Sequence, residues 1–285
     1  MENDIIKIEA HAKLNLLLDV IAKRPDGYHE LEGIMQEITL ADEVFLTPAE
    51  DIEVICDEPL PEFNTCRMAA EGFLAESGLG VRIEVRKRIP SEAGLGGASA
   101  DAAAVLLGLN RMFHDTALER SLEDLLALGL CIGADVPFCL TGGCAIARGV
   151  GEDLTPVKGM SMPVLIVRGP RGVSTGKLFR SLSMGPEMRS RLKENALENA
   201  LEAIANEDPE ALGACLENAL QGPAAQLAPE IDEYCRRMLD SGALGACMTG
   251  SGAAVFGIFR SRAEANAALE VFCDCDFAEV CETVS

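Results

Sequence analysis

The sequence predicts an α/β protein in which strands and helices alternate along most of the chain. Short runs rich in Val and Ile are typical of strands, and longer segments in which Leu and Ala recur at helical spacing are typical of helices. Gly and Pro stand at most junctions between these segments, as turns require. A chain of 285 residues that is 48% hydrophobic is long enough for one large domain or two smaller ones with a substantial core.

The first half of the chain begins with strands. They are predicted over residues 4–24 (one strand or two), 37–48, 51–57 and 81–89. In the last of these segments Val81, Ile83, Val85 and Lys87 alternate with charged residues, which indicates that one face of the strand is wet. A helix is predicted over 66–77, because a glycine follows it directly.

The remaining elements continue this alternation. A glycine-rich turn after Pro90 leads into a long helix, and Ser121 is suited to cap the next helix. The later elements are predicted as a strand over 163–167, consecutive helices over 190–240, a strand–turn–strand unit over 246–259, a helix from Arg262 and a last strand over 277–284. The loop 151–162 is the natural boundary, so two domains are predicted, at 1–155 and 156–285.

The composition excludes several classes of function. A formal net charge of −22 argues against non-specific nucleic-acid binding, which favours a basic surface. The 11 cysteines include no CxxC pair and the three histidines have no zinc-site spacing, so free thiols in a reducing cytoplasm are expected. The N-terminus lacks a signal-peptide pattern, and no apolar run reaches the ~18 residues of a membrane span. A cytoplasmic protein with no nucleic-acid or membrane partner is therefore expected.

The segment PSEAGLGGASADAAAVLLGLN, residues 90–110, combines a glycine-rich turn with a helix that is apolar nearly all round. Glycine permits positive φ angles and lets a ligand approach the backbone. A helix start leaves N–H groups without carbonyl partners and carries partial positive charge, which favours an anion such as phosphate. The segment lacks the Lys of a Walker A motif, and Ser99 stands where a dinucleotide fingerprint needs a third glycine. The alternative is a tight turn closed by a cap at Ser99 or Gly97, with Asp101 in the first turn of the helix.

Two other segments carry candidate functional side chains. Lys13 and Asn15 lie two residues apart in a predicted strand among leucines, so they share a face. A lysine in that setting needs an anionic partner or a ligand. The turn RPDGYHEL then displays Tyr28 and His29. In GADVPFCLTGG, Asp135 precedes Val, Pro and Phe, so its carboxylate is either a helix or turn cap or a base.

These segments, together with MTGSGAAVFGIF over 248–259, resemble in the same order the signature segments of the GHMP kinase superfamily. The turn RPDGYHEL is similar to that of the branch whose substrate is a CDP-linked methylerythritol of the non-mevalonate isoprenoid pathway, and separates the chain from mevalonate and homoserine kinases. The resemblance covers most of the chain. It implies a two-domain α/β fold with a ribosomal-protein S5-like N-terminal domain, a ferredoxin-like C-terminal domain and the active site in the cleft.

The resemblance also implies a reaction and its residues. The γ-phosphoryl group of ATP would pass, with Mg²⁺, to a hydroxyl of the methylerythritol part of the substrate. Asp135 would accept or orient the hydroxyl proton, and Lys13 would keep Asp135 ionised and draw charge from the hydroxyl and the γ-phosphate. ATP would be bound by the loop residues Pro90, Ala93, Gly94, Leu95, Gly96, Gly97, Ala98 and Ser99. The substrate would be bound by Asn15, Tyr28, His29, Phe179, Thr249, Gly250, Ser251 and Gly252, with the three aromatic side chains on cytidine.

Several positions depart from the superfamily pattern. Ala98 and Ala100 replace a glycine and a serine, and both are small enough for the loop. The segment Asn218–Gln221 reads NALQ where two acidic groups are expected, which leaves its role open. Local cations besides the strand lysine, such as Arg24 and Arg148, are expected to offset the acidic surface for two anionic reactants.

Two other functions stay open at the level of sequence. One is a GHMP kinase with a different alcohol substrate, which would not need the Tyr28–His29 turn or Phe179; that phenylalanine would then be an ordinary core residue. The other is a non-catalytic nucleotide-binding relative, against which the presence of both Lys13 and Asp135 argues. The sequence assigns no Mg²⁺ ligand and implies no obligate protein partner.

Overall fold

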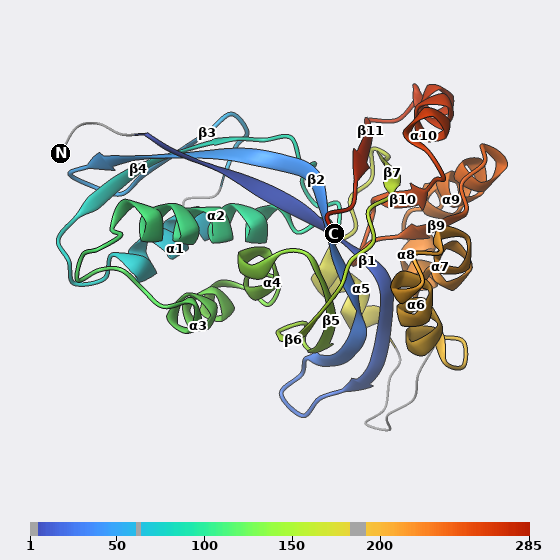
Figure 1. Cartoon of the computed structure of the whole chain (residues 1–285), viewed down its shortest axis with the longest axis horizontal. Coiled ribbons are helices and arrows are strands. Elements are labelled where there is room, and N and C mark those ends of the chain that lie inside the picture. Colours follow the sequence, from blue (N-terminus) through green and yellow to red (C-terminus); the bar gives the residue numbers. More distant parts are fainter. Residues whose placement is uncertain (1–4, 61–63, 183–191) are drawn as a thin grey trace. The chain divides into compact units, whose positions relative to one another are not determined.

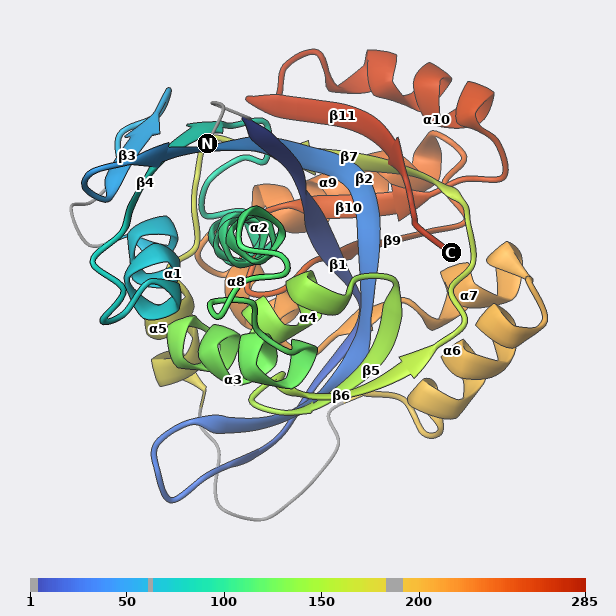
Figure 2. The ribbon, with the colours of Figure 1, turned by 60° about the vertical axis from the view of Figure 1, so that its left-hand side comes forward.

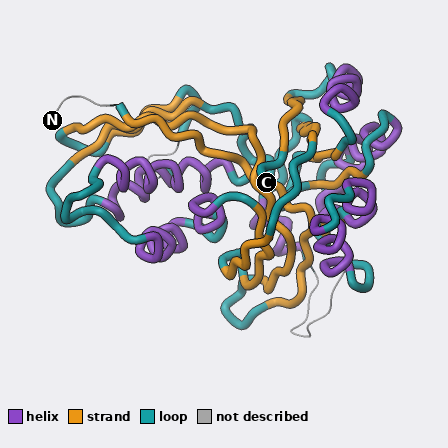
Figure 3. The backbone as a smooth tube through the Cα atoms, viewed as in Figure 1, coloured by secondary structure: helices purple, strands orange, loops and turns teal. Residues whose placement is uncertain are grey.

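The computed structural model describes residues 5–60, 64–182 and 192–285, and it has the predicted mixture of helices and strands (Figure 3). The strands are β1 (Ile6–Lys23), β2 (His29–Ala49), β3 (Glu53–Cys56), β4 (Gly80–Arg86), β5 (Cys144–Gly149), β6 (Asp153–Val157), β7 (Pro163–Arg168), β8 (Glu217–Asn218), β9 (Gly245–Met248), β10 (Val255–Ile258) and β11 (Phe277–Glu282). The helices are α1 (Thr65–Phe73), α2 (Gly97–Met112), α3 (Leu122–Ile132), α4 (Val136–Thr141), α5 (Thr175–Ser181), α6 (Ala196–Ala205), α7 (Pro209–Cys215), α8 (Gln221–Ala225), α9 (Glu230–Asp240), α10 (Arg262–Leu269) and the 3₁₀ helix η1 (Glu270–Phe272).

Some boundaries differ from those predicted. Of the two possibilities for the first segment, one strand or two, the structure has the single long strand β1. The helix predicted over 66–77 ends at Phe73, because Leu74 closes it with a backbone hydrogen bond and Glu76 has a positive φ of 62°. The run of helices predicted over 190–240 is interrupted by β8, and its first two positions lie outside the described residues.

Two compact units make up the structure, and neither is a single stretch of chain. The first contains Met1–Ala12, Leu40–Ile89 and Gly96–Gly142, and the second contains Lys13–Thr39, Pro90–Leu95 and Gly143–Ser285, each apart from its residues that are not described. Since β1 and β2 each supply residues to both units, no single cut of the chain separates them. The division into 1–155 and 156–285 therefore stays a prediction about sequence domains.

In the first unit, helices cover one face of a sheet. β2 pairs antiparallel with β4, and β3 pairs parallel with β4. Val81, Ile83 and Val85 are buried while Arg82 is exposed, which confirms the alternation predicted for β4. Figures 1 and 2 show α1 and α2 on the same side of these strands. A Cβ atom on Gly108 of α2 would lie 2.4 Å from a methyl carbon of a leucine on β2, so glycine allows this helix to lie close to the sheet.

Helices α1, α2, α3 and α4 of the first unit begin in two different ways. Asn64 caps α1 by accepting a hydrogen bond from a backbone N–H, and Ser121 forms a reciprocal capping box with Asp124 at α3. The N-cap residues of α2 and α4 are Gly96 and Asp135, and neither helix has a side-chain cap. α2 is also buried on nearly all sides, as its apolar sequence predicted.

The second unit is built on an antiparallel sheet of strand order β11-β7-β10-β9. Helix α9 packs on β9 and β10, and α10 packs on β7 and β11. Its core contains Met248 and Val255, which flank the loop between β9 and β10. In the same unit β5 pairs with β2 and β6, and β8 pairs in parallel with β1. Among the described residues, no helix combines the length and apolar character needed to cross a bilayer.

Candidate active site

The glycine-rich turn ends where α2 begins. Gly94 and Gly96 have φ angles of 77° and 74°, in the left-handed region that favours glycine. Gly96 is the N-cap residue, and its carbonyl oxygen accepts the N–H of Ser99 over 3.0 Å. The first N–H groups of the helix, those of Gly97 and Ala98, therefore stand at the positive end of a 16-residue helix. The alternative placed the cap at Ser99 or Gly97, whereas the N-cap residue is Gly96 and no side chain caps the helix.

Glycine is required at position 94 for a second reason. A Cβ atom on Gly94 would lie 2.2 Å from the carbonyl oxygen of Thr249, and one on Gly250 would lie 2.7 Å from the carbonyl oxygen of Gly94. The N–H of Ala254 also donates to the carbonyl of Ala93 over 3.1 Å. Within the second unit, the start of the glycine turn and the loop between β9 and β10 thus pack backbone against backbone.

Lys13 and Asn15 lie on the same face of β1 and contact each other. The Nζ atom of Lys13 donates to Oδ1 of Asn15 over 2.6 Å, and both side chains are buried. The backbone N–H of Lys13 donates to the carbonyl of Leu95 over 3.0 Å, and that of Asn15 donates to Oγ1 of Thr249 over 3.0 Å. The strand that carries both side chains is therefore fixed to both loops of the second unit.

Asp135 precedes α4 in the first unit. Aspartate is a favoured capping residue, yet this side chain makes no capping hydrogen bond. Its carbonyl oxygen accepts the N–H of Cys139 over 3.1 Å, as the first turn of a helix requires. The half-buried side chain of Asp135 therefore does not cap α4. Its role as a base stays a prediction. Because Lys13 belongs to the other unit, the pairing of Lys13 with Asp135 stays a prediction.

The predicted cytidine residues lie in the second unit, and two of them are in contact. The rings of His29 and Phe179 are tilted by 32° with centroids 5.0 Å apart. His29 is buried, Phe179 is half-buried, and Tyr28 is 66% exposed on the turn before β2. That turn is ordered by Asp26, whose Oδ1 accepts the backbone N–H of Tyr28 over 3.0 Å. Segments 150 residues apart thus bring one buried and one half-buried ring into contact. Contact of these residues with cytidine stays a prediction.

The loop between β9 and β10 is held by its threonine. Thr249 is fully buried, and its N–H donates to the carbonyl of Ala254 over 3.1 Å. Its Oγ1 accepts the N–H of Asn15, so the hydroxyl orders the loop. Ser251 is half-buried, and its hydroxyl shares a 2.6 Å hydrogen bond with the hydroxyl of Thr175, which begins α5. Contact of the four loop residues with a substrate stays a prediction.

The sequence analysis missed an ion cluster in the first unit. Nζ of Lys87 donates to Oδ2 of Asp101 over 2.5 Å and also to Oδ2 of Asp42. Asp42 accepts the backbone N–H of Ile89 over 2.8 Å as well. A Cβ atom on Gly97 would lie 3.6 Å from the Lys87 Nζ, so the cluster lies directly beneath the start of α2. Lys87 continues the alternation of the buried valines of β4, and this position was the signal that could have revealed the cluster.

Burial and charge act against each other in this cluster. Burial alone would lower the pKa of Lys87, but the attraction of Asp101 and Asp42 outweighs it and raises that pKa to about 12. Burial raises the pKa of Asp101 to about 7, because the attraction of Lys87 does not fully compensate and the charge of Asp42 adds repulsion. The lysine is therefore always charged at neutral pH, whereas Asp101 takes up a proton as the solution becomes mildly acidic.

The segment whose role the sequence left open also belongs to the site. Asn218 donates to carbonyls of β9 and of the loop that follows it, and Gln221 accepts a backbone N–H of β9. The cations expected to offset the acidic surface are already paired: Arg24 with Asp26 and Glu30, and Arg148 with an acidic residue of β2. Neither arginine therefore adds the net positive charge that was expected of it.

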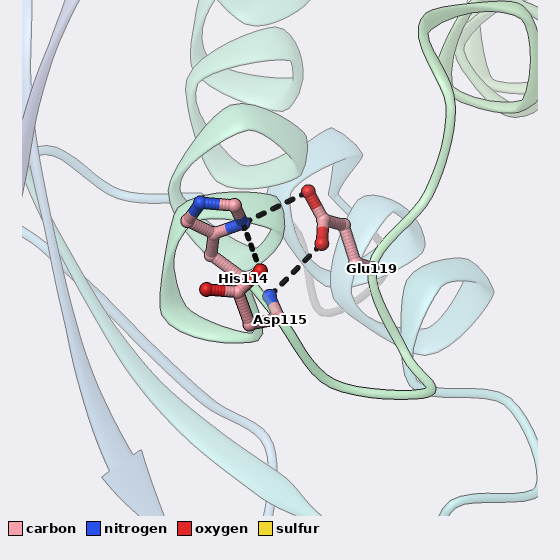
Figure 4. Close-up of side chains that lie close together, drawn as sticks. All are labelled: His114, Asp115 and Glu119. Carbon is pink, nitrogen blue, oxygen red and sulfur yellow. Dashed lines mark hydrogen bonds and ion pairs between the residues drawn. The ribbon is translucent and has the colours of Figure 1, made fainter.

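One cluster of metal-ligating side chains lies elsewhere. Within the described residues, His114, Asp115 and Glu119 form the single group of three such side chains with ligand atoms within 4.8 Å of one another (Figure 4). The Nδ1 atom of His114 and Oε1 of Glu119 are 3.0 Å apart, and this contact raises the pKa of His114. All three are exposed and follow the C-terminal end of α2, whereas the glycine turn precedes its start, so the cluster is separate from the candidate site.

Two family models match the chain on either side of its middle. The GHMP kinases N terminal domain matches residues 64–143, and the GHMP kinases C terminal model matches residues 200–275. The first match contains the whole glycine turn, α2 and Asp135, and the second contains the β9–β10 loop. Fold and site together therefore define a kinase of the GHMP class, which confirms the resemblance seen in the sequence motifs.

Relatives narrow the class further. A 4-diphosphocytidyl-2-C-methyl-D-erythritol kinase of Carboxydothermus hydrogenoformans is 41% identical over 257 residues, which cover 88% of this chain and 87% of the relative. A crystal structure of 4-(cytidine 5'-diphospho)-2C-methyl-D-erythritol kinase matches with a TM-score of 0.82 at 36% identity, covering 98% of this chain and all of that one. The chain belongs to the family of 4-diphosphocytidyl-2-C-methyl-D-erythritol kinases.

A more distant structure shares only the fold. Homoserine kinase from Cytophaga hutchinsonii matches with a TM-score of 0.75 at 20% identity, over all of this chain and 96% of that one. The two-domain GHMP fold is therefore confirmed. Membership in a kinase family also implies ATP as a substrate.

Proposed function

We propose that this chain transfers the γ-phosphoryl group of ATP to the 2-hydroxyl of 4-diphosphocytidyl-2-C-methyl-D-erythritol, in the non-mevalonate pathway to isoprenoid precursors. The observation that carries this substrate is the contact between His29 and Phe179 beside the exposed Tyr28. A flat pyrimidine binds to such a surface by stacking, and an alcohol without a base would not use it. The relatives at about 40% identity carry the same substrate in their names.

The phosphates of ATP are proposed to bind at the start of α2. The left-handed turn at Gly94 and Gly96 exposes backbone, and the uncapped helix start directs N–H groups and the positive dipole end outward. A side-chain cap would compete with the ligand for these donors. Asp101 lies more than one turn inside the helix and is paired with Lys87, so its charge is partly neutralised beneath the site.

Asp135 and Lys13 are proposed to act on the acceptor hydroxyl. Asp135 would accept or orient the hydroxyl proton, a role worth about 10²–10⁴ in rate. Lys13 would supply positive charge to the hydroxyl and to the phosphoryl oxygens, where charge develops in the transition state. The contact with Asn15 fixes the position of the ammonium group, and Asn15 would also contact the polyol of the substrate.

Mg²⁺ is proposed as the metal of the reaction. It commonly keeps several water ligands and takes one or two protein oxygens together with phosphate oxygens. Half-buried Asp135 and Ser99, at two helix starts of the first unit, fit that modest requirement in donor chemistry. The metal would neutralise phosphate charge, while the side chains above orient the hydroxyl and take up its proton.

The decisive experiment is release of ADP from ATP and Mg²⁺, measured with the cytidyl substrate and with mevalonate, homoserine and galactose in parallel. We expect turnover with the cytidyl substrate alone, and we expect free CDP to compete with it. Turnover with another alcohol would favour a different GHMP kinase. ATP binding by calorimetry without turnover of any of the four would favour the non-catalytic relative. The cytoplasmic location and the lack of an obligate protein partner stay predictions.

A further inference from the structure

Asn218 is fixed to the strand that carries Lys13 and Asn15. It lies in β8, the two-residue strand that pairs in parallel with β1 opposite Leu18. The N–H of Ala219 donates to the carbonyl of Leu18 over 2.8 Å, which closes the pairing. The backbone of Asn218 therefore has a defined position relative to the candidate active-site strand, within the second unit.

The side chain of Asn218 uses both of its N–H groups on one loop. Nδ2 donates to the carbonyl of Met248 over 2.8 Å and to the carbonyl of Gly250 over 2.9 Å, and Oδ1 accepts the N–H of Leu220 over 2.9 Å. The residue is 6% exposed, so water does not readily replace these bonds. The first carbonyl belongs to the Met248–Thr249 peptide unit and the second to the Gly250–Ser251 unit, so one amide sets the orientation of two peptide planes of the loop.

The orientation of one of these planes has a consequence for Ser251. The carbonyl of Gly250 and the N–H of Ser251 belong to the same peptide unit, and this unit is trans. In a trans peptide the C=O and N–H bonds point in opposite directions. Because Asn218 holds the carbonyl, the N–H of Ser251 is directed away from Asn218. The hydroxyl of Ser251 is held separately by Thr175.

The other hydrogen bonds of the loop, among the described residues, use other atoms. The N–H of Gly252 donates to the carbonyl of Thr249 over 2.9 Å, which closes a turn around the Gly250–Ser251 peptide unit without holding the Gly250 carbonyl. Oε1 of Gln221 accepts the N–H of Met248 over 3.0 Å and so holds the end of β9. Thr249 joins the loop to β1 and to the glycine turn. Gly250 and Gly252 have φ angles of 56° and 82°, a conformation in which glycine has many alternatives. A loop of this kind needs a side-chain restraint to keep one arrangement.

We propose that Asn218 is a positioning residue, which directs the Ser251 N–H toward an anionic oxygen of a bound reactant. The inference rests on the proposed function in one respect, namely that the β9–β10 loop contacts a phosphate-bearing reactant. A preorganised backbone donor at developing charge contributes about 10²–10³ to the rate. A backbone N–H that points elsewhere loses part of this contribution, although no catalytic group has been removed.

The test combines kinetics with amide hydrogen exchange. Asn218→Ala should lower kcat/KM by about 10- to 100-fold and should speed exchange of the loop amides at Thr249 and Gly252 by at least ~10-fold. The matched control is Asn110→Ala, since Asn110 also bridges distant backbone, donating to the carbonyl of Arg120 over 3.1 Å. The Asn110→Ala variant should lose stability, but its kcat, its KM for each of the two substrates and the exchange of its loop amides should not change. If Asn218→Ala does not fold, Asn218→Ser, which leaves room for a bridging water, carries the same test.

A second variant separates the role of Asn218 as a hydrogen-bond donor from its role in packing. Asn218→Asp keeps the acceptor for Leu220 but turns a carboxylate oxygen toward two carbonyl oxygens. Its activity should fall below that of Asn218→Ala at pH 8 and recover as the pH is lowered, because the protonated carboxyl regains one donor. A purely structural role would produce no such pH profile relative to the wild-type enzyme.

The inference is overturned if folded Asn218→Ala retains loop protection and kinetics within about twofold of the wild type. It is overturned equally if kcat falls only in proportion to the fraction of unfolded protein. Failure of the proposed function has a different signature, because the wild-type enzyme itself would then be inactive with the cytidyl substrate. In that case the exchange measurement still decides whether Asn218 sets the loop.

Discussion

Within the first unit, the starts of α1 and α3 differ from those of α2 and α4. Asn64 and Ser121 satisfy backbone N–H groups of α1 and α3 with their side chains. The N-cap residues of α2 and α4, Gly96 and Asp135, do not. A missing cap costs about 0.5–2 kcal/mol. The two helices that forgo it are those that carry the candidate ATP loop and the candidate base, so stability is given up where donors or a carboxylate are needed for a ligand.

The second unit offers a contrast to these helix starts. Its candidate groups are side chains and a glycine loop, and they are ordered by hydrogen bonds between segments far apart in the sequence. Thr249 joins the β9–β10 loop to β1, and Asn218 joins the same loop to β8, which pairs with β1. We therefore expect substitutions at the helix starts of the first unit to change the rate of turnover or the affinity for ATP. Substitutions of the aromatic side chains in the second unit should affect the affinity for the cytidyl substrate.

The largest effect is expected at Asp135. Asp135→Asn should lower kcat by about 10²–10⁴, because an amide does not accept the hydroxyl proton. Stability and ATP binding should change little, since the carboxylate makes no capping bond and Asn is an equally good N-cap residue. Ser121→Ala is the control with a functional cap. It should lose about 1 kcal/mol of unfolding free energy and keep its kcat. A kcat of Asp135→Asn within a few-fold of the wild type would remove Asp135 from the mechanism.

The contrast between helix starts and long-range contacts also explains which features of the structure could be predicted from the sequence. The cap at Ser121 and the alternation in β4 are local patterns, and both are confirmed. The family motifs identified the fold class and the kinase family for the same reason. The two-residue strand β8 has no periodicity from which it could be predicted.

The contacts that the sequence could not reveal join distant residues. Lys87 meets Asp42 from 45 positions away, and Asn218 meets Met248 from 30 positions away. Burial of a lysine indicates that partners must exist without saying which acids they are. The side-chain roles of the NALQ segment depend on such a contact. The sequence therefore showed that two expected acidic groups are missing from this segment, but not what the segment does instead.

Loss of the aromatic surface is the next largest effect. Stacking of a base on an aromatic ring is worth about 1–3 kcal/mol, so Phe179→Ala or Tyr28→Ala should raise the KM of the cytidyl substrate by about 5- to 150-fold. His29→Ala should act similarly, because its ring packs on Phe179. The KM for ATP should remain within twofold in steady-state assays. Loss of ATP affinity instead would contradict the division between the two units and the assignment of the cytidine site.

A smaller effect is expected at the start of α2. Gly96→Val places a β-branched residue at a φ of 74°, which strains the turn by about 1–2 kcal/mol. The KM for ATP should rise by about 5- to 30-fold while that of the cytidyl substrate is unchanged. Gly78→Val is the matched control, because Gly78 has a φ of 69° and open space around its Cα, outside the glycine turn. Equal ATP affinity of the two folded variants in calorimetry would show that the Gly96 turn has no special role in binding.

The smallest effect concerns how α2 is anchored without a cap. The ion cluster beneath its start holds Asp101, whose pKa burial raises to about 7, whereas an unfolded aspartate has a pKa near 3.8. Between these two values the folded state binds one more proton than the unfolded state, so the free energy of unfolding falls as the pH rises. The slope from this group is at most about 1.4 kcal/mol per pH unit and vanishes above pH 7, where both states are deprotonated.

Asp101→Asn removes this titration and keeps an acceptor for Lys87. In chemical denaturation at pH 5.5 and 7.5, the difference in unfolding free energy between wild type and variant should therefore change with pH, with the wild type relatively more stable at pH 5.5. Asp124→Asn is the control, because the hydroxyl and the N–H of Ser121 lower the pKa of that exposed carboxyl. The contribution of Asp124 is complete above about pH 5 and is lost only as the pH falls further, so its variant should differ from the wild type by a constant amount at both pH values. Parallel curves for wild type and Asp101→Asn would mean that Asp101 stays ionised, and that a full salt bridge anchors the uncapped helix.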